Sequence, residues 1–120
     1  MGFIDGVFRM RFSKRKWGWY FTLLSGVGFK VKLLYFGAGK SLSMQRHMKR
    51  SEIWLFLRGD GKMWVSKEST VNKHKLFYAG KGASMIIRAL DWHQYTAKTP
   101  TFVLEIQTGQ CEEEDIERKE

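Results

Sequence analysis

The sequence predicts an all-β domain, either a sandwich or a barrel, and three observations support this fold class. Apolar segments are short, and glycine-containing or polar turns separate them at a spacing of roughly ten residues. Several segments alternate apolar and polar residues, as half-buried strands do. No segment longer than the C-terminal tail repeats its apolar residues with a helical period. At 120 residues the chain is long enough for one packed core, so a single domain is expected.

The clearest strand covers residues 29–36, where three apolar residues alternate with Lys30 and Lys32. This alternation predicts a half-buried strand with one apolar and one basic face. Asp60-Gly61 stands between two apolar runs and predicts a hairpin turn. Further short strands are expected at residues 63–65, 76–78, 83–87 and 101–107, with a turn at residues 80–82 and a polar loop at residues 66–73.

The charge of the chain is unevenly distributed. The net charge is +9, but residues 112–120 hold six acidic and two basic side chains, a net −4, which leaves +13 on the remaining 111 residues. A body this basic attracts nucleic acid, anionic partners or phosphorylated substrates. The lysines are scattered, and no RNP-like or helix-turn-helix pattern is present. We therefore interpret the charge as a solvated basic surface and do not expect nucleic-acid binding.

Neither membrane insertion nor secretion is expected. The longest uncharged run, residues 17–29, has 13 residues including three glycines and is too short to span a bilayer. Arg9 and Arg11 interrupt the N-terminal apolar residues, which therefore lack the form of a signal peptide. The single cysteine, Cys111, excludes an internal disulfide and fits a reducing cytoplasm. Because Cys111 stands in a polar tail, we do not expect it to be a nucleophile.

Candidate metal ligands lie in the stretch between Gly39 and Gly59. Gln45 and His47 are two residues apart and share one face of a strand, while Glu52 follows after polar residues that suit a turn. Such a hairpin brings the three side chains to a common point. An amide oxygen, an imidazole and a carboxylate are acceptable ligands for Mn, Fe, Co, Ni or Zn. From spacing alone, a surface pair or a satisfied core pair of histidine and glutamate remains the commoner alternative.

The wider pattern resembles the first conserved motif of the cupin superfamily, with Gln45 where many cupins carry the first histidine. Residues 43–47, Ser-Met-Gln-Arg-His, followed by Arg50, Glu52 and Trp54, are similar to the signature of type II mannose-6-phosphate isomerases. In those proteins the isomerase domain often follows a GDP-mannose pyrophosphorylase domain. The likeness runs from about Trp17 to Arg118 and so covers most of the chain.

The resemblance implies a cupin fold, a double-stranded β-helix that forms a jelly-roll-like barrel. We assign the barrel to residues 17–111. Residues 1–16 form an N-terminal arm or an extra strand, for which the resemblance offers no counterpart. Residues 112–120 form an acidic C-terminal tail. His74 lies in the predicted polar loop region, matches no motif position and is expected at the surface.

The second cupin motif is present in spacing but altered in residue type. Gly82, Arg88 and His93 keep its spacing, so His93 corresponds to the last metal-binding histidine. Arg88 replaces a proline, Leu90 replaces a glycine, and Ala97 stands where an asparagine is common. Because leucine does not easily adopt a positive φ angle, we expect the loop before His93 to take another shape.

The resemblance implies one divalent metal ion held by four side chains, Gln45, His47, Glu52 and His93. It implies isomerisation of mannose 6-phosphate to fructose 6-phosphate, in which the metal polarises the carbonyl and stabilises the enediolate. Arg50 occupies the arginine position of the motif and is assigned to charge stabilisation or substrate positioning, with a surface charge at a turn as the alternative.

Charge and placement suggest that Arg88 or Lys30 contacts the substrate phosphate. The resemblance also implies a homodimer that associates through a sheet. Two other functions remain open: a non-catalytic cupin that binds a metal or a carbohydrate, and a basic interaction protein whose site is only structural. Cupins serve many functions, so the fold does not choose among them.

Overall fold

The computed structural model describes residues 11–66 and 74–119, and the described part of the chain is all-β, as predicted. Residues 1–10, most of the predicted loop at residues 66–73, and the side chain of His74 lie outside this description. The strands are β1 (Arg11–Arg15), β2 (Gly18–Gly26), β3 (Phe29–Phe36), β4 (Met44–Arg46), β5 (Arg50–Arg58), β6 (Asp60–Ser66), β7 (His74–Gly80), β8 (Ser84–Ile87), β9 (Trp92–Ala97), β10 (Thr101–Gly109) and β11 (Glu117–Lys119).

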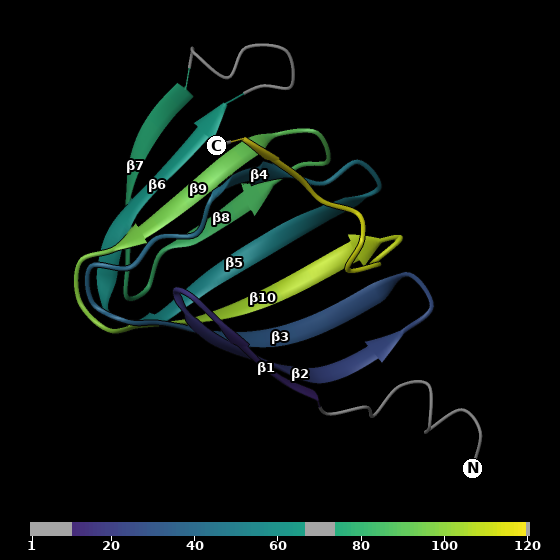
Figure 1. Ribbon diagram of the computed structural model, residues 1–120, viewed down its shortest axis with the longest axis horizontal. Helices are drawn as coiled ribbons and strands as arrows, with labels where there is room; N and C mark the ends of the chain where they lie inside the picture. The colour runs from purple at the N-terminus through teal and green to yellow at the C-terminus, as the bar shows by residue number, and fades with distance from the viewer. Residues whose placement is uncertain (1–10, 67–73, 120) are drawn as a thin grey trace.

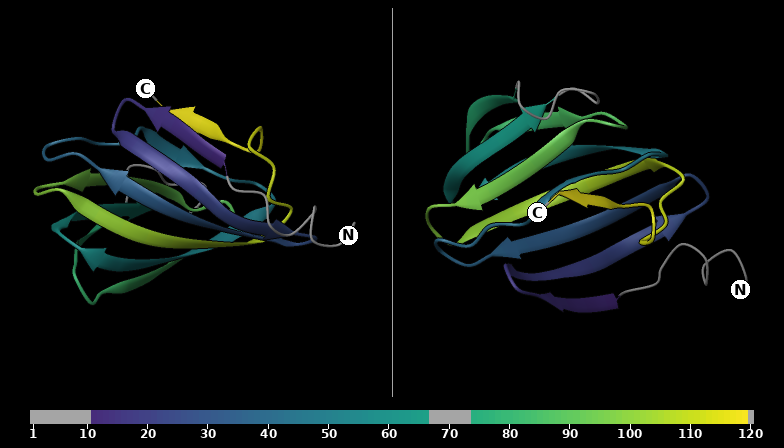
Figure 2. Two further views of the ribbon diagram at one scale, coloured as in Figure 1. Left: turned by 90° about the horizontal axis from the view of Figure 1, so that it is seen from below. Right: turned by 45° about the horizontal axis from the view of Figure 1, so that its top comes forward.

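The strands form two antiparallel sheets that face each other (Figure 1). The six-stranded sheet has the order β1-β2-β3-β10-β5-β8, and the five-stranded sheet has the order β11-β4-β9-β6-β7. Figure 2 shows the two layers from two further sides. The C-terminal segment, yellow in Figure 1, leaves β10 in one sheet and reaches β4 in the other, where β11 pairs with it. The predicted all-β, jelly-roll-like architecture is therefore confirmed.

The predicted hairpin at Asp60-Gly61 is wrong, because β5 and β6 belong to different sheets. β5 pairs with β10 and β8, whereas β6 pairs with β7 and β9. The chain turns a corner at Gly59, whose φ is +89°, and a Cβ atom there would overlap the carbonyl oxygen of Pro100. The Asp60 amide donates to Thr99 Oγ1 at 3.0 Å, which ties the corner to the neighbouring loop. A turn at glycine thus leads the chain from one sheet to the other, instead of joining two paired strands as a hairpin.

The predicted hairpin that carries the first metal ligands is corrected in the same way. β4 pairs with β9 and β11, while β5 lies in the opposite sheet. Gln45 therefore comes from the five-stranded sheet and Glu52 from the six-stranded sheet, with His47 in the connection between them. The three side chains therefore line one cavity between the sheets and do not follow one ladder.

One end of the interior is apolar and the other end is polar. The apolar end is formed by large buried side chains of both sheets, including Leu34, Phe36, Trp54, Phe56, Met63, Tyr95 and Val103. At the polar end the expected alternation of β3 is reversed: Lys32 is only 4% exposed, whereas Val31 and Leu33 on the opposite face are half-buried. On β10, Glu105 and Gln107 are likewise buried. The interior surface of this sheet therefore lines a polar space.

The outer face of the six-stranded sheet is correspondingly apolar. Phe12, Trp19, Tyr35 and Phe102 form a row of aromatic rings across β1, β2, β3 and β10, with successive centroids 5.7, 5.5 and 5.0 Å apart. On β8, at the far edge, Ile86 is 63% exposed. Antiparallel sheets more commonly pair an apolar inner face with a polar outer face, so this sheet departs from the usual arrangement on both faces.

Candidate metal centre

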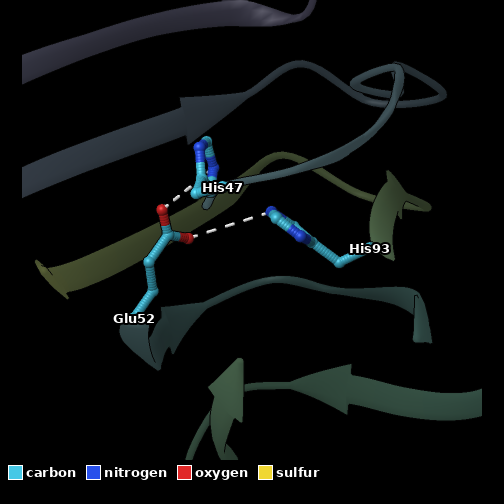
Figure 3. A group of neighbouring side chains, drawn as sticks. All are labelled: His47, Glu52 and His93. Atoms are coloured by element: carbon cyan, nitrogen blue, oxygen red, sulfur yellow. Dashed lines mark ion pairs between the residues drawn. The ribbon is translucent and has the colours of Figure 1, made fainter. Parts of the chain in front are cut away.

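His47, Glu52 and His93 come together at the polar end of the interior, as the sequence predicted for these three residues (Figure 3). His47 Nε2 lies 3.2 Å from Glu52 Oε2, and His93 Nε2 lies 3.9 Å from Glu52 Oε1. The three ligand atoms all lie within 4.8 Å of one another, and each side chain is buried. The connection after β4, the start of β5 and the start of β9 supply one candidate ligand each, so both sheets contribute.

Backbone contacts set the tautomer of both imidazole rings. His47 Nδ1 lies 2.6 Å from the carbonyl oxygen of Asp115, and His93 Nδ1 lies 3.3 Å from that of Asp91. A carbonyl oxygen only accepts, so Nδ1 carries the hydrogen and each Nε2 keeps its lone pair toward Glu52. Burial lowers the pKa of His47, helped by Arg50, and lowers the pKa of His93 to about 3, helped by the His47 ring. Both rings are therefore neutral near pH 7.

This donor set fits a divalent metal ion. Two Nε2 lone pairs and a carboxylate face one another, and acceptors at such short range repel unless a metal ion or a hydrogen-bond donor is shared between them. Neutral imidazole nitrogens and a carboxylate suit Zn, Fe, Co, Ni or Mn. The carbonyl groups that hold the Nδ1 hydrogens are the kind of outer partner that orients ligating histidines in metal sites.

Arg50, the predicted catalytic residue, lies directly beside this group and is only 7% exposed. Its Nε donates to Glu52 Oε2 at 3.0 Å, its Nη2 donates to His47 Nε2 at 3.1 Å, and its Nη1 donates to the carbonyl oxygen of Glu112 at 3.2 Å. The guanidinium thus supplies positive charge to the two acceptors. It also uses the lone pair of His47 Nε2 that a metal ion would need, so a bound metal requires Arg50 Nη2 to give up that bond.

Gln45, the fourth predicted ligand, lies in β4 directly opposite His93 in β9 and lines the same cavity. Its Nε2 donates to the carbonyl oxygen of Ser43 at 3.3 Å, which leaves Oε1 as the amide acceptor. The role of Gln45 as a ligand stays a prediction. Its placement on the strand beside His93 agrees with that role.

The loop that presents His93 differs from the sequence-based expectation. Leu90 does adopt a positive φ, 75°, so the loop keeps the left-handed residue that glycine would supply. Four hydrogen bonds hold the strained turn: Leu90 N to His47 O at 2.7 Å, Asp91 N to Arg88 O at 3.0 Å, Arg88 N to Asp91 Oδ2 at 3.1 Å, and Ala89 N to Ser51 Oγ at 3.1 Å. Strain of about 1–2 kcal/mol is tolerated because these bonds over-determine the turn.

A cavity of about 630 Å³ opens next to the metal ligands. Glu105 lines it, and burial together with the neighbouring Glu52 carboxylate raises the pKa of Glu105 to about 7. Gln107 Nε2 donates to Glu105 Oε1 at 2.7 Å, whereas Gln107 Oε1 is, within the described residues, a buried acceptor without a hydrogen-bond partner. Sequence reasoning missed both residues. The sequence does contain one signal for them: Glu105 and Gln107 stand at alternate positions from the apolar Val103, so all three lie on the same face of β10.

The two basic residues predicted to contact phosphate lie apart from each other. Lys30 Nζ forms an ion pair with Glu113 Oε2 at 2.9 Å and lines a neighbouring cavity of about 320 Å³. Arg88 is exposed, and it does not belong to the described residues that line the larger cavity. The backbone amide and carbonyl of Arg88 form hydrogen bonds with Asp91 in the turn before His93. Arg88 as a phosphate contact therefore gains no support from the geometry, and the described cavity has other basic residues that sequence reasoning did not single out: Arg15, Lys16, Lys32 and Arg118.

Cys111 has the environment of an unreactive thiol. Its Sγ donates to the carbonyl oxygen of Gly109 at 3.5 Å, and burial raises its pKa. This agrees with the expectation that Cys111 is not a nucleophile.

Within residues 11–66 and 74–119, no helix is long and apolar enough to cross a lipid bilayer.

The two facing antiparallel sheets with a His–Glu–His group between them define a cupin, and comparison with solved structures agrees. CapF from Staphylococcus aureus superposes with a TM-score of 0.80 at 13% identity, over 97% of this chain and 33% of that one. Oxalate decarboxylase from Bacillus subtilis gives 0.78 at 13% identity, over 93% and 31%. A Bacillus halodurans protein gives 0.70 at 16% identity, over 89% and 74%. These similarities show the fold alone.

The chain belongs to the family described as mannose-6-phosphate isomerase, C-terminal, whose model matches residues 7–120. Mannose-1-phosphate guanylyltransferase of Sinorhizobium fredii is 34% identical over 70 residues, 58% of this chain. Alginate biosynthesis protein AlgA of Pseudomonas putida is 32% identical over 109 residues, 88% of this chain, and ManC of Salmonella typhimurium is 27% identical over 108 residues, also 88%. The chain spans only 14–21% of the length of these curated relatives.

Proposed function

We propose that the protein is a metal-dependent aldose–ketose isomerase that converts mannose 6-phosphate to fructose 6-phosphate. The observation that carries the proposal is the buried His47–Glu52–His93 group, in which neither Nε2 atom is protonated, at the wall of a 630 Å³ cavity. Pockets of this volume suit a small-molecule substrate. Membership of the mannose-6-phosphate isomerase family and the basic cavity lining support a sugar phosphate as that substrate.

His47, Glu52 and His93 would hold the metal ion, with Gln45 as a proposed fourth ligand. A bound divalent metal supplies polarisation of a carbonyl group and stabilisation of enediolate charge. Arg50 adds a fixed positive charge next to Glu52 and His47, in a buried position where electrostatic effects are strong.

Gln107 suits the positioning of a sugar. Its buried Oε1 lacks a hydrogen-bond donor among the described residues, and a substrate hydroxyl that donates to it would satisfy that acceptor. The hydrogen bond from Gln107 Nε2 to Glu105 Oε1 holds the amide in the orientation that presents Oε1. Such a contact orients the sugar relative to the metal ligands.

The direct test is isomerisation of mannose 6-phosphate by protein reloaded in turn with Mn, Co, Ni and Zn. We expect turnover with at least one metal and its loss in His47→Ala. Arg88→Ala is the matched surface control, because Arg88 is exposed and outside the cavity lining, and we expect it to retain activity. Stoichiometric metal binding that needs His47, without turnover for any metal, would refute the isomerase and leave a metal-binding cupin.

A second function, a non-catalytic binding module, has its own support. Arg50 Nη2 uses the His47 Nε2 lone pair at 3.1 Å, so the site is electrostatically satisfied in part without a metal ion. The relatives named above are guanylyltransferases and an alginate biosynthesis protein, of which this chain covers about a fifth. In this case the cavity binds a carbohydrate, and metal addition leaves the affinity for sugar phosphate unchanged.

We also propose that two copies associate through the apolar outer face of the six-stranded sheet. The aromatic row of Phe12, Trp19, Tyr35 and Phe102 and the exposed Ile86 lie on this face. A two-fold interface places the same patch on both subunits, and an apolar patch is complementary to itself. A cytoplasmic location, for which the single cysteine is the support, completes the proposal.

A further inference from the structure

A carboxylate from the C-terminal segment occupies a basic pocket on the inner face of the six-stranded sheet. Glu113 Oε2 lies 2.9 Å from Lys30 Nζ and 2.8 Å from Lys32 Nζ, and Glu113 Oε1 lies 3.1 Å from Lys32 Nζ. The Tyr20 hydroxyl donates to Glu113 Oε1 at 3.4 Å. Three donor groups from β2 and β3 thus converge on one carboxylate, which is the arrangement expected around a bound anion.

Lys32 is the buried member of this group. Its side chain is 5% exposed, and its Nζ lies 4.1 Å from the centroid of the Tyr20 ring, over its face. An ammonium group in such a position needs a counter-ion, because burial of an unpaired charge is costly. Tyr20, on the neighbouring strand β2, supplies a cation–π contact, and the C-terminal segment supplies the carboxylate. The Glu113 side chain is 47% exposed, far more than its partner.

The pocket keeps excess positive charge even with Glu113 in place. Lys30 and Lys32 together carry +2 against the single negative charge of Glu113. Arg15 stands next to them, with its Nη2 donating to the Tyr20 hydroxyl at 3.2 Å. A phosphate monoester near pH 7 carries up to two negative charges and three acceptor oxygens, so it matches these donors better than one carboxylate does.

Glu113 also forms the wall between two cavities. It lines the 630 Å³ cavity together with Arg15, Lys32 and the metal ligands, and it lines the 320 Å³ cavity together with Lys30. Tyr20 lines both as well. Displacement of one side chain, Glu113, therefore joins the two spaces and exposes the lysines to whatever occupies the larger cavity.

We propose that Lys30, Lys32 and Tyr20 form a phosphate-binding subsite and that Glu113 is its internal competitor, which a phosphorylated ligand displaces. This inference rests on the proposed function for the identity of the ligand. The phosphate group takes the place of the Glu113 carboxylate, and the Glu113 side chain turns out of the pocket when it does so. The backbone contacts of Glu112 and Asp115 with Arg50 and His47 stay in place.

The strand register gives the distance between this subsite and the metal ligands. Lys30 is the direct partner of Gln107 on β10, which is the direct partner of Glu52 on β5. Neighbouring strands are about 4.8 Å apart, so the backbones of Lys30 and Glu52 are about 10 Å apart. Six bonds separate the ketose carbonyl carbon from the phosphorus of a hexose 6-phosphate, about 7 Å when extended. This length is of the same order as the separation of the two backbones, and Lys32, Glu113 and the metal-ligand candidates line one cavity.

Titration calorimetry with inorganic phosphate tests the inference without turnover. We expect Glu113→Gln to bind phosphate about threefold to tenfold more tightly than the unmodified protein, since the internal competitor is gone. Glu114→Gln is the matched control, because Glu114 is exposed in the same segment and carries the same charge, and we expect no change. Lys32→Met should abolish phosphate binding. Lys30→Met should weaken it and serves as the second variant, since Lys30 is less buried.

Equal phosphate affinity in the unmodified protein, Glu113→Gln and Glu114→Gln would overturn the competitor role. Undiminished binding in both lysine variants, or undetectable binding in the unmodified protein and in Glu113→Gln, would overturn the subsite. Mannose 6-phosphate and mannose serve as further titrants, and we expect only the phosphorylated sugar to respond to Glu113→Gln. Phosphate binding that follows these expectations without isomerase turnover would contradict the proposed reaction and leave the subsite intact.

Discussion

Replacement of Glu105 by glutamine tests the electrostatics of the cavity. Burial and the Glu52 carboxylate raise the pKa of Glu105 from an ordinary value of 4.5 to about 7, so the native protein holds a proton that the unfolded chain releases. The protonated carboxyl donates to Glu52 and accepts from Gln107 Nε2. A glutamine amide has both a donor and an acceptor and reproduces these two bonds without a titrating group.

The expected effect depends on pH in a defined direction. Between pH 4.5 and about 7 the unfolded chain has lost this proton and the native state retains it, so the contribution of Glu105 to stability falls as pH rises. The difference between a pKa of 4.5 and one of about 7 for Glu105 corresponds to about 3 kcal/mol. In metal-free protein, Glu105→Gln should match the unmodified protein at pH 4.5 and exceed its free energy of unfolding by up to about 3 kcal/mol at pH 8.

Urea unfolding followed by tryptophan fluorescence, in the presence of a chelator, measures this difference at pH 4.5, 6, 7 and 8. The difference between the two proteins is the relevant quantity, because the lowered pKa values of His47 and His93 add a pH dependence of opposite sign to both. Glu114→Gln, at an exposed position, is the control and should show a flat difference. A difference for Glu105→Gln that stays constant within about 0.5 kcal/mol from pH 4.5 to 8 would refute the reasoning.

The remaining predictions concern the corner, the metal ligands, the outer face and the C-terminal contact. Gly59→Ala should destabilise the domain by about 2 kcal/mol or more in urea unfolding, because its φ is +89° and the new Cβ overlaps the Pro100 carbonyl; an unchanged midpoint would contradict this corner geometry. His93→Gln should lower zinc affinity at least tenfold in a chelator competition assay, with no change expected for Gln94→Ala, and equal affinities would exclude His93 as a ligand. Leu104→Glu, on the half-buried outer face, should convert a dimer to a monomer in light scattering, and an unaltered mass would place any interface elsewhere. Acidification should release the Glu113 contact only below about pH 3, because the lysines lower the pKa of Glu113 to about 2; NMR shifts of the Lys32 Nζ resonance that change above pH 6 would contradict this.

Much of the local structure was predictable from the sequence. The alternation over residues 29–36 predicted a strand, and β3 spans Phe29–Phe36. The spacing of His47, Glu52 and His93, together with the family resemblance, predicted three residues that the structure brings within 4.8 Å. Strand boundaries and motif spacing are local properties, because alternation and turn residues act on a few neighbouring positions.

The partners of the strands, and the faces they bury, were decided by the tertiary structure. Asp60-Gly61 is a strong turn signal, yet the turn leads from one sheet to the other, because a turn sequence specifies a change of direction and not the strand that pairs next. The alternation around Lys32 has two faces, and the buried one is polar because it lines a cavity. Leu90 takes a positive φ because four hydrogen bonds from distant and local groups over-determine its turn.

The candidate site shows the same division between sequence and tertiary structure. The residue types at motif spacing, together with the family resemblance that they carry, were enough to select His47, Glu52 and His93 from the sequence. Only the tertiary structure placed Glu105 beside Glu52 and brought Glu113 to Lys32, a residue 81 positions away in the chain. Neither contact leaves a local pattern, because each joins side chains from separate strands or segments across the interior. Their pKa shifts arise from that proximity and from burial, which exist only once the two sheets have closed on each other.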